Sequence, residues 1–290
     1  MRSLLDRLVV VLKMIKFSHS VFALPFALIA WLLAARDRAP SARVLCWVVV
    51  AMVGARSAAM AFNRLVDQSF DAANPRTRDR ALPRGAISRT FTWVFVLASL
   101  AVFHAAALAL NRLCLVLSPA VTLVLLGYSF TKRFTMLSHV ILGLALGLAP
   151  CGAWLAVRGT LDGSFVTPVL LGIAVLFWVA GFDIIYACQD VDFDRRHGLF
   201  SLPARVGIDR ALRISTWLHA LAVIALTALW LAEGLGTPAL LGVIAVALLL
   251  WYEHALVKPA DLSRVNLAFF NVNGLIGILL FASVLVDLYW

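Results

Sequence analysis

The stretch from Phe165 to Asp190, FVTPVLLGIAVLFWVAGFDIIYACQD, shows what kind of protein this chain is. Its only charged residues are Asp183 and Asp190, both near its C-terminal end. A helix needs about 20 apolar residues to cross a hydrocarbon core of about 30 Å. The run therefore predicts a membrane-spanning helix with an acidic end.

Runs of this kind recur along all 290 residues, of which 63% are hydrophobic and only 14% charged. Soluble domains have about 25% charged residues. The short alternating segments of a membrane β-barrel are absent from the sequence. We therefore predict an all-α integral membrane protein, a single transmembrane domain over residues 1–290. The charged segment 1–17 is expected to be an interfacial amphipathic helix. Nine spans are predicted, at 18–35, 43–68, 90–110, 113–131, 134–157, 165–190, 210–232, 237–257 and 265–287.

The basic residues predict the orientation of the chain. With nine spans, 18 Lys and Arg fall on the side of the N-terminus and five on the opposite side. Positive loops stay in the cytoplasm. The N-terminus and the charge-rich loops are therefore expected to be cytoplasmic in a bacterial inner membrane. The net charge of +10 follows from this rule and from attraction to anionic lipid, so it does not indicate a nucleic-acid partner.

The acidic residues gather at two places on that side. Eight of the 15 lie at or beside the ends of the second and sixth spans: Asp67, Asp71, Asp79, Asp183, Asp190, Asp192, Asp194 and Asp209. Asn63, Asp67 and Asp71 are spaced i, i+4, i+8, and Asp190 and Asp194 repeat the i, i+4 spacing. On a helix each set lies along one face.

Such columns of like charge require a cation, because ionised Asp in a membrane helix costs roughly 2.5–3.5 kcal/mol. Oxygen ligands without His or Cys favour Mg²⁺, which usually joins carboxylates to phosphate oxygens. Five of the six histidines form no ligand pattern: His104, His139, His197, His219 and His254. We therefore expect Mg²⁺ at Asn63, Asp67, Asp71, Asp190 and Asp194, with a diphosphate bridged by two Mg²⁺ ions between the two clusters.

Basic residues on the same side fit a phosphate ligand. Lys132 and Arg133 lie beside Tyr128 on a predicted hairpin between spans four and five. Arg76 and Arg78 follow Asn74-Pro75, which is expected to end the second span and to let Arg76, Arg78 and Arg80 cover the site. For each Arg the alternative is a purely topological role.

A short repeat follows both clusters. ALPRGAISR (81–89) and SLPARVGIDR (201–210) both contain Leu-Pro, a basic residue, a Gly turn and a polar residue, Ser88 or Asp209, expected to cap the next helix. The match predicts two related four-helix units, helices one to four and five to eight, with a ninth helix added.

These residues resemble the UbiA superfamily of intramembrane prenyltransferases. Its motif N-D-x-x-D-x-x-x-D is matched by NRLVDQSFD (63–71), and its motif D-x-x-x-D by Asp190 to Asp194. The resemblance covers essentially the whole chain. It implies Mg²⁺-dependent transfer of a polyprenyl chain from an allylic diphosphate to an aromatic quinone precursor. The acceptor would be 4-hydroxybenzoate or 1,4-dihydroxy-6-naphthoate, and both stay open.

By this likeness Asp67, Asp71, Asp190 and Asp194 are catalytic, and Lys132 and Arg133 bind the leaving diphosphate. Tyr128 would face the allylic cation with its π electrons, with interfacial anchoring as the alternative. Other acceptors of the same family, and an ion-coupled transporter, are the competing functions. A transporter would place its ionisable residues near mid-membrane, whereas here they lie at one end.

Two arginines, Arg56 and Arg64, lie within the second predicted span. Arg64 stands where the family motif has its first Asp. It is expected to lie about 100° off the Asn63, Asp67 and Asp71 face, so that loss of metal binding is not implied and a different balance of charge at the site stays open. Arg56 lies two turns deeper than Asn63, and an acceptor carboxylate is its expected partner. The alternatives for Arg56 are Asp183 and a helix carbonyl.

Overall fold

The fold is described from a computed structural model. It describes residue 10, residues 22–37, residue 39 and residues 41–290. The predicted interfacial segment 1–17 and the start of the first predicted span lie outside these residues, apart from residue 10. Both stay predictions.

The described part of the chain is helical and contains no β-strand, which confirms the all-α class. Eight helical spans within it are long and apolar enough to cross a membrane. The shorter apolar helix α2 (Leu24–Ala34) lies in the first predicted span. The eight spans are built on α3 (Ala42–Val66), α5 (Arg89–Leu110), α6 (Arg112–Thr131), α7 (Ser138–Arg158), α8 (Val166–Ala187), α11 (Ile208–Ala232), α12 (Thr237–Leu256) and α14 (Asn273–Tyr289).

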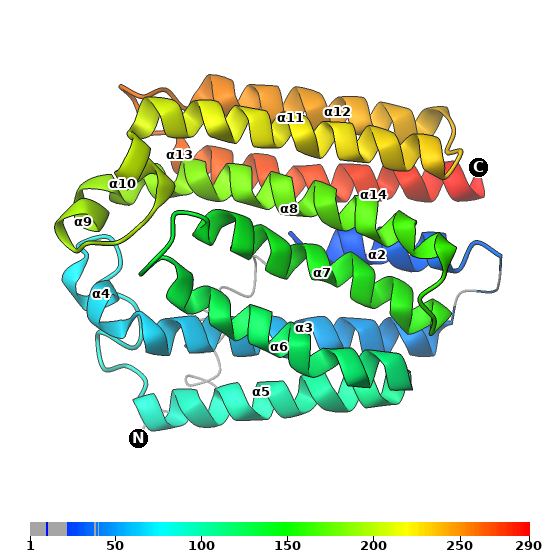
Figure 1. The fold of residues 1–290 in the computed structure, drawn as a ribbon, viewed down its shortest axis with the longest axis horizontal. Coiled ribbons are helices and arrows are strands. Elements are labelled where there is room, and N and C mark those ends of the chain that lie inside the picture. Colours follow the sequence, from blue (N-terminus) through cyan, green and yellow to red (C-terminus); the bar gives the residue numbers. More distant parts are fainter. Residues whose placement is uncertain (1–9, 11–21, 38, 40) are drawn as a thin grey trace. The chain divides into compact units, whose positions relative to one another are not determined.

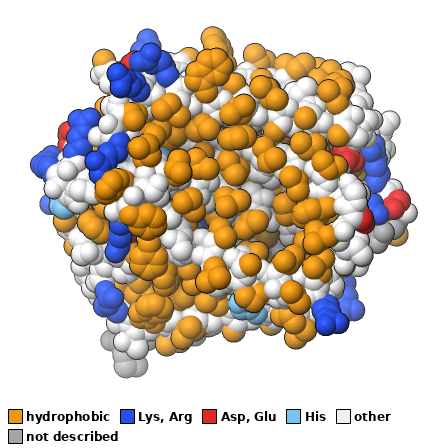
Figure 2. Space-filling model, in the orientation of Figure 1, with side chains coloured by type: hydrophobic (Ala, Val, Ile, Leu, Met, Phe, Trp, Pro, Cys, Tyr) orange, Lys and Arg blue, Asp and Glu red, His pale blue; other side chains and the backbone are white. Residues whose placement is uncertain are grey.

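The outward faces of these helices carry large apolar side chains. Leu123 in α6, Trp217 in α11 and Trp251 in α12 are each more than 70% exposed. Hydrophobic side chains make up most of the face in view (Figure 2). Apolar surface on this scale is unfavourable in water and is stable in lipid. The chain is therefore a multi-pass membrane protein.

The chain forms two compact units. The first comprises Arg43–Phe130 among the described helices. In it α3 approaches α5 closely at Gly54, where a Cβ would lie 3.0 Å from the Ser99 carbonyl oxygen. Ala61, Phe62 and Leu65 of α3 pack with Val96 of α5 in a buried cluster. The short helix α4 (Gln68–Ala73) continues beyond the end of α3.

The second unit comprises Val21–Ala42 and Thr131–Trp290. In it α8 packs against both α7 and α11, and α12 packs against α14 (Figure 1). Helix α2 packs on α7 and α14, so it belongs to this unit. The predicted repeat of helices one to four and five to eight therefore does not coincide with the compact units, and the single domain stays a prediction.

A buried polar network ties three helices of the second unit together. The indole Nε1 of Trp178 (α8) donates to Oδ1 of Asn273 at 2.6 Å. Nδ2 of Asn273, at the start of α14, donates to Oε1 of Glu253 (α12) at 2.8 Å and to the Ala268 carbonyl. Ala268 opens η4 (Ala268–Val272), a π-helical turn that leads into α14. Buried polar groups need such partners, so the network fixes how these helices meet.

Replacing Gly143 with alanine is expected to destabilise the second unit. A Cβ at Gly143 in α7 would lie 2.2 Å from the backbone carbonyl oxygen of Leu176 in α8, so the two helices would have to separate. Overpacking of this kind costs about 1–3 kcal/mol. Gly152→Ala is the matched control, because nothing lies within 4 Å of a Cβ at that position in the same helix. Melting temperatures in detergent should fall only for Gly143→Ala, and equal values for both variants would contradict the packing.

Candidate active site

The first acidic cluster lies where α3 passes into α4. The helix α3 ends at Val66 and α4 begins at Gln68, with Asp67 between them. The backbone nevertheless keeps helical spacing, because Asp67 N donates to Asn63 O at 2.9 Å and Asp71 N to Asp67 O at 2.7 Å. Nδ2 of Asn63 also donates to Oδ2 of Asp67 at 2.9 Å. The predicted column of Asn63, Asp67 and Asp71 is therefore present.

Both carboxylate oxygens of Asp71 are bound by arginines. Nη1 of Arg80 lies 2.6 Å from Oδ1, and Nη1 of Arg64 lies 3.3 Å from Oδ2. Asp71 and Arg64 are both buried, and the Asp71 carbonyl accepts a hydrogen bond from Thr77 Oγ1. Charge-assisted hydrogen bonds of this kind are stronger than neutral ones. Asp71 is therefore the centre of a buried arginine cluster.

The expected position of Arg64 is wrong with respect to Asp71, whereas the expectation that Arg64 does not abolish metal binding stays a prediction. Arg64 does follow Asn63 by about 100° around the helix, but it precedes Asp71 by seven residues. Seven residues are close to two full turns, so the two side chains point within about 20° of each other. Arg64 therefore lies on the face of Asp71 and pairs with it.

Of the three arginines expected to cover the site, Arg76, Arg78 and Arg80, the structure places Arg80 in contact with the first acidic cluster. Helix α4 ends at Ala73, and Asn74 Oδ1 accepts from Arg76 N, so the predicted helix end is confirmed. Arg80 reaches Asp71, whereas the side chains of Arg76 and Arg78 are exposed. Their role as phosphate ligands stays a prediction.

The capping predictions of the repeat had different outcomes. Ser88 caps α5 as expected, because its Oγ accepts from Phe91 N at 3.2 Å. Asp209 does not cap α11. Gly207, with φ at 85°, precedes the helix, and Asp209 lies within the first turn, where it pairs with Arg213. The extra residue in the second copy of the repeat moves the acidic side chain past the capping position.

The second acidic cluster lies beyond the end of α8. A 3₁₀ turn, η3 (Cys188–Asp190), leads into the short helix α9 (Val191–Arg196), which carries Asp194. Asp190 is buried and Asp194 has no exposed surface, whereas Asp192 between them is exposed. The predicted pair therefore points inward, away from Asp192.

Lys132 neutralises Asp194. A turn after α6, in which Phe134 N and Thr135 N donate to the Thr131 carbonyl, carries Lys132, and Lys132 Nζ lies 2.9 Å from Asp194 Oδ1. The contact is an ion pair and not a directed hydrogen bond, because neither oxygen of Asp194 has a hydrogen-bond partner among the described residues. Phe200 N also donates to the Lys132 carbonyl at 2.7 Å. The structure thus joins a predicted phosphate ligand and a predicted metal ligand.

A histidine bridge that the sequence did not predict holds the segment after α9. His139 Nδ1 lies 2.7 Å from Asp183 Oδ2, and Leu202 N donates to His139 Nε2 at 3.3 Å. Because the amide is a donor, Nε2 accepts and the imidazole proton lies on Nδ1, facing Asp183. Leu202 begins α10 (Leu202–Val206), and Arg195 of α9 donates to the Ala204 carbonyl. The bridge therefore connects α7, α8 and the chain beside the second cluster.

His139→Phe is expected to loosen this segment, because it removes both hydrogen bonds. Amides of residues 199–206 should exchange with solvent roughly 5- to 10-fold faster, in keeping with about 1 kcal/mol for one hydrogen bond. His139→Gln keeps one donor and one acceptor and is the matched control. Hydrogen exchange followed by mass spectrometry measures this, and unchanged exchange in His139→Phe would contradict the bridge.

The remaining predicted residues occupy separate positions. Arg56 lies in α3, partly buried, and its Nε has no hydrogen-bond partner among the described residues. Asp183, one expected alternative partner, pairs with His139. Tyr128 is partly buried in the last turns of α6, and Arg133 is exposed. The roles proposed for these three residues stay predictions.

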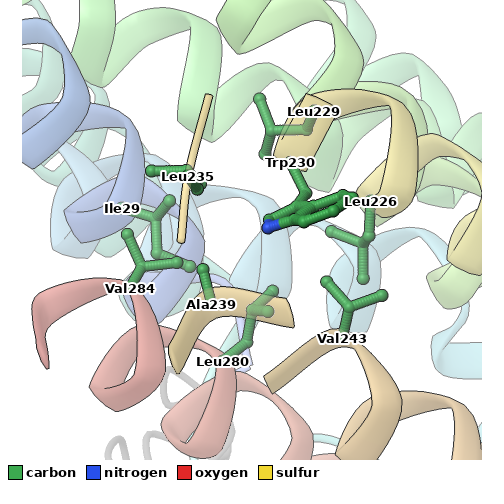
Figure 3. A pocket seen from close by; sticks show the side chains of 9 residues that line it. All are labelled: Ile29, Leu226, Leu229, Trp230, Leu235, Ala239, Val243, Leu280 and Val284. Atoms are coloured by element: carbon green, nitrogen blue, oxygen red, sulfur yellow. The ribbon is translucent and has the colours of Figure 1, made fainter. Parts of the chain in front are cut away.

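An apolar crevice lies at the other end of the second unit. It lies between the C-terminal part of α11, the start of α12, α14 and α2 (Figure 3). The one polar side-chain atom in its lining, Trp230 Nε1, donates to the Gly236 carbonyl. The crevice thus offers no donor for a phosphate or a carboxylate. It is lined by Ile29, Leu226, Leu229, Trp230, Leu235, Ala239, Val243, Leu280 and Val284.

The chemistry of the acidic residues fits Mg²⁺ in part. Among the described residues, no three His, Cys, Asp or Glu side chains form a ready metal site. In the second cluster Asp194 Oδ1 faces Lys132 Nζ at 2.9 Å, and the buried Oδ2, which has no hydrogen-bond donor among the described residues, is the oxygen that suits a hard cation. In the first, Asn63 and Asp67 offer oxygen ligands, but Asp71 is already paired with Arg64 and Arg80.

Comparison with known proteins identifies the family. The chain matches the UbiA prenyltransferase family over residues 23–275. It is 33% identical over 254 residues to the 4-hydroxybenzoate octaprenyltransferase of Alkalilimnicola ehrlichii, an alignment that covers 86% of this chain and 84% of the relative. The apo structure of a UbiA homolog from Aeropyrum pernix K1 matches with a TM-score of 0.85 and 38% identity, over 93% of this chain and 98% of that chain.

A UbiA homolog from Archaeoglobus fulgidus bound to GPP and Mg²⁺ has the same fold. Its TM-score is 0.75 at 21% identity, over 97% of this chain and all of that chain. The fold, the two acidic clusters and the family match agree with one another. This chain belongs to the UbiA prenyltransferase family and is a membrane prenyltransferase.

Proposed function

We propose that this enzyme transfers a polyprenyl group from an allylic polyprenyl diphosphate to a ring carbon of an aromatic acid precursor of a respiratory quinone. The observation that carries the proposal is the pair of acidic clusters with oxygen ligands and adjacent Arg or Lys. The 33% identical relative is a 4-hydroxybenzoate octaprenyltransferase, which favours 4-hydroxybenzoate as acceptor. Family membership favours this enzyme over an ion-coupled transporter.

Mg²⁺ would be held by Asn63, Asp67, Asp190 and Asp194. Asp71 would contribute through the two arginines that it binds, Arg64 and Arg80. Bound Mg²⁺ would stabilise the negative charge that grows on the departing diphosphate. Among the chain's own groups, Lys132 supplies positive charge beside Asp194, and Arg64 and Arg80 supply it beside Asp71. Arg133, Arg76 and Arg78 are proposed as further diphosphate ligands.

The reaction replaces a carbon–oxygen bond with a carbon–carbon bond. The allylic carbon–oxygen bond breaks and its electron pair leaves with diphosphate. The aromatic ring carbon attacks the allylic carbon, and the ring then loses a proton to a base. Apolar helices keep water from the allylic cation, and Tyr128 is proposed to face it. Arg56, with its buried Nε, is proposed to bind the acceptor carboxylate.

The enzyme is proposed to lie in the bacterial inner membrane with its N-terminus and active site in the cytoplasm. The sequence supports this with 18 Lys and Arg on one side and five on the other. A polyprenyl diphosphate has a long apolar tail and a charged head, so the bilayer is its expected source.

The acceptor is tested by comparing two aromatic acids. Purified enzyme in lipid nanodiscs receives Mg²⁺ and a radiolabelled prenyl diphosphate, with either 4-hydroxybenzoate or 1,4-dihydroxy-6-naphthoate. We expect a higher kcat/KM with 4-hydroxybenzoate. A preference for the naphthoate would keep the reaction and change the acceptor, whereas no prenylated product with any aromatic acceptor would overturn the proposed function.

A further inference from the structure

We propose that the Arg64 guanidinium takes the place of one divalent cation in the first acidic cluster, so that this chain binds one metal ion fewer there than the family motif provides for. The inference rests on the proposed function for its role in catalysis. Its geometric basis is the buried contact between Arg64 and Asp71.

Arg64 lies inside the first acidic cluster and contacts one of its carboxylates, Asp71. Its Nη1 lies 3.3 Å from Asp71 Oδ2, and Arg80 Nη1 lies 2.6 Å from the other oxygen of the same carboxylate. A carboxylate with both oxygens bound by guanidinium groups is a poor ligand for a cation, because the cation would meet two positive charges at the same place. The arginines therefore occupy the side of the column where Asp71 would ligate metal.

The charge balance points the same way. Asp67 and Asp71 carry two negative charges, and Arg64 and Arg80 carry two positive charges, so the four side chains sum to zero. With Asp at position 64, as in the motif, the same four side chains would sum to −2. The difference equals the charge of one Mg²⁺ ion. A buried cluster with an uncompensated charge of −2 is costly, so the motif with Asp requires a cation that this chain does not need.

Arg64 also differs from a metal ion in what it offers to a diphosphate. A guanidinium presents N–H donors in a planar fork, keeps its charge and does not exchange with solvent cations. Positive charge at this cluster should therefore persist at low Mg²⁺ concentration. We expect catalysis to depend on Mg²⁺ mainly through the second cluster and the Asn63–Asp67 pair.

Counting bound metal ions tests the inference without reference to activity. The full-length protein in detergent is dialysed against increasing Mn²⁺, and bound Mn²⁺ per chain is measured for the wild type and for Arg64→Asp. We expect Arg64→Asp to bind one more Mn²⁺ than the wild type. Arg89→Asp is the matched control, because it makes the same charge change beside Gln68 and Arg89 contacts no carboxylate among the described residues. It should bind as many Mn²⁺ ions as the wild type.

Equal Mn²⁺ counts in the wild type and Arg64→Asp would overturn the inference, as would an equal gain in Arg89→Asp. Arg64→Gln gives a second test if Arg64→Asp fails to fold, since it removes the charge and adds no carboxylate. We expect it to bind Mn²⁺ roughly 10-fold more tightly at the first cluster than the wild type does, because one of the two positive charges that oppose a cation there is gone, and an unchanged Mn²⁺ affinity would count against the inference. A wild type that binds Mn²⁺ but transfers no prenyl group would refute the proposed function and leave the Mn²⁺ counts to decide the role of Arg64.

Discussion

Asp190→Asn is expected to lower kcat by at least about 100-fold, because it removes a buried carboxylate of the second cluster while keeping nearly the same side-chain size. Losing one preorganised electrostatic group at an active site typically costs about 2.7–4 kcal/mol of transition-state stabilisation. Asp67→Asn should have a comparable effect in the first cluster. The measurement is the single-turnover rate of prenyl transfer at saturating Mg²⁺.

Matched controls exist in each cluster. Asp192 lies two residues from Asp190 and is exposed, and Asp79 is exposed beyond α4. Asp192→Asn and Asp79→Asn remove the same charge and should keep kcat within about twofold. The melting temperatures of all four variants show whether a lower turnover rate comes from a changed active site or from unfolding of the protein. Normal turnover in Asp190→Asn or Asp67→Asn would refute the assignment of that cluster to the active site.

Lys132→Met is expected to lower both activity and stability, because it leaves the fully buried Asp194 without its ionic partner. Removing one partner of a buried ion pair costs about 3–5 kcal/mol. Lys132 itself is 36% exposed, so solvent screens part of the interaction and we expect about 2 kcal/mol. Activity should fall further than stability alone explains, because Lys132 is also proposed to contact the diphosphate.

The double variant Lys132→Met, Asp194→Asn separates these two effects. It removes both charges, so its melting temperature should return most of the way to that of the wild type while its activity stays low. Lys258→Met, at an exposed loop position, controls for loss of a lysine. A double variant no more stable than Lys132→Met would show that the ion pair does not hold the second cluster.

Eight of the nine predicted spans correspond to helices long and apolar enough to cross a membrane, because each depends on local composition, and the ninth stays a prediction. The helix from Arg89 to Leu110, for example, lies within one residue of its predicted start, since an apolar run and a capping Ser88 both mark it. Asp190 and Asp194 are candidate site residues for a similar reason. A carboxylate at the end of an apolar run is unusual enough to be noticed without a structure.

Contacts between distant segments were not predictable in this way. The bridge from His139 to Asp183 joins residues 44 positions apart, and its only signal was that Asp183 lies within an apolar span and needs a partner. The pairing of Lys132 with Asp194 likewise depends on how α7 packs beside α8. Arg64 is different, because its seven-residue separation from Asp71 is visible in the sequence and by itself places the two side chains on one face of a helix.

The most direct test of the account is Mg²⁺-dependent turnover by the purified enzyme in nanodiscs with a polyprenyl diphosphate and 4-hydroxybenzoate. We predict that prenylated product and diphosphate form in equal amounts, that EDTA stops both, and that added Mg²⁺ restores both. Diphosphate release without a prenylated aromatic product, or turnover that EDTA does not affect, would contradict it.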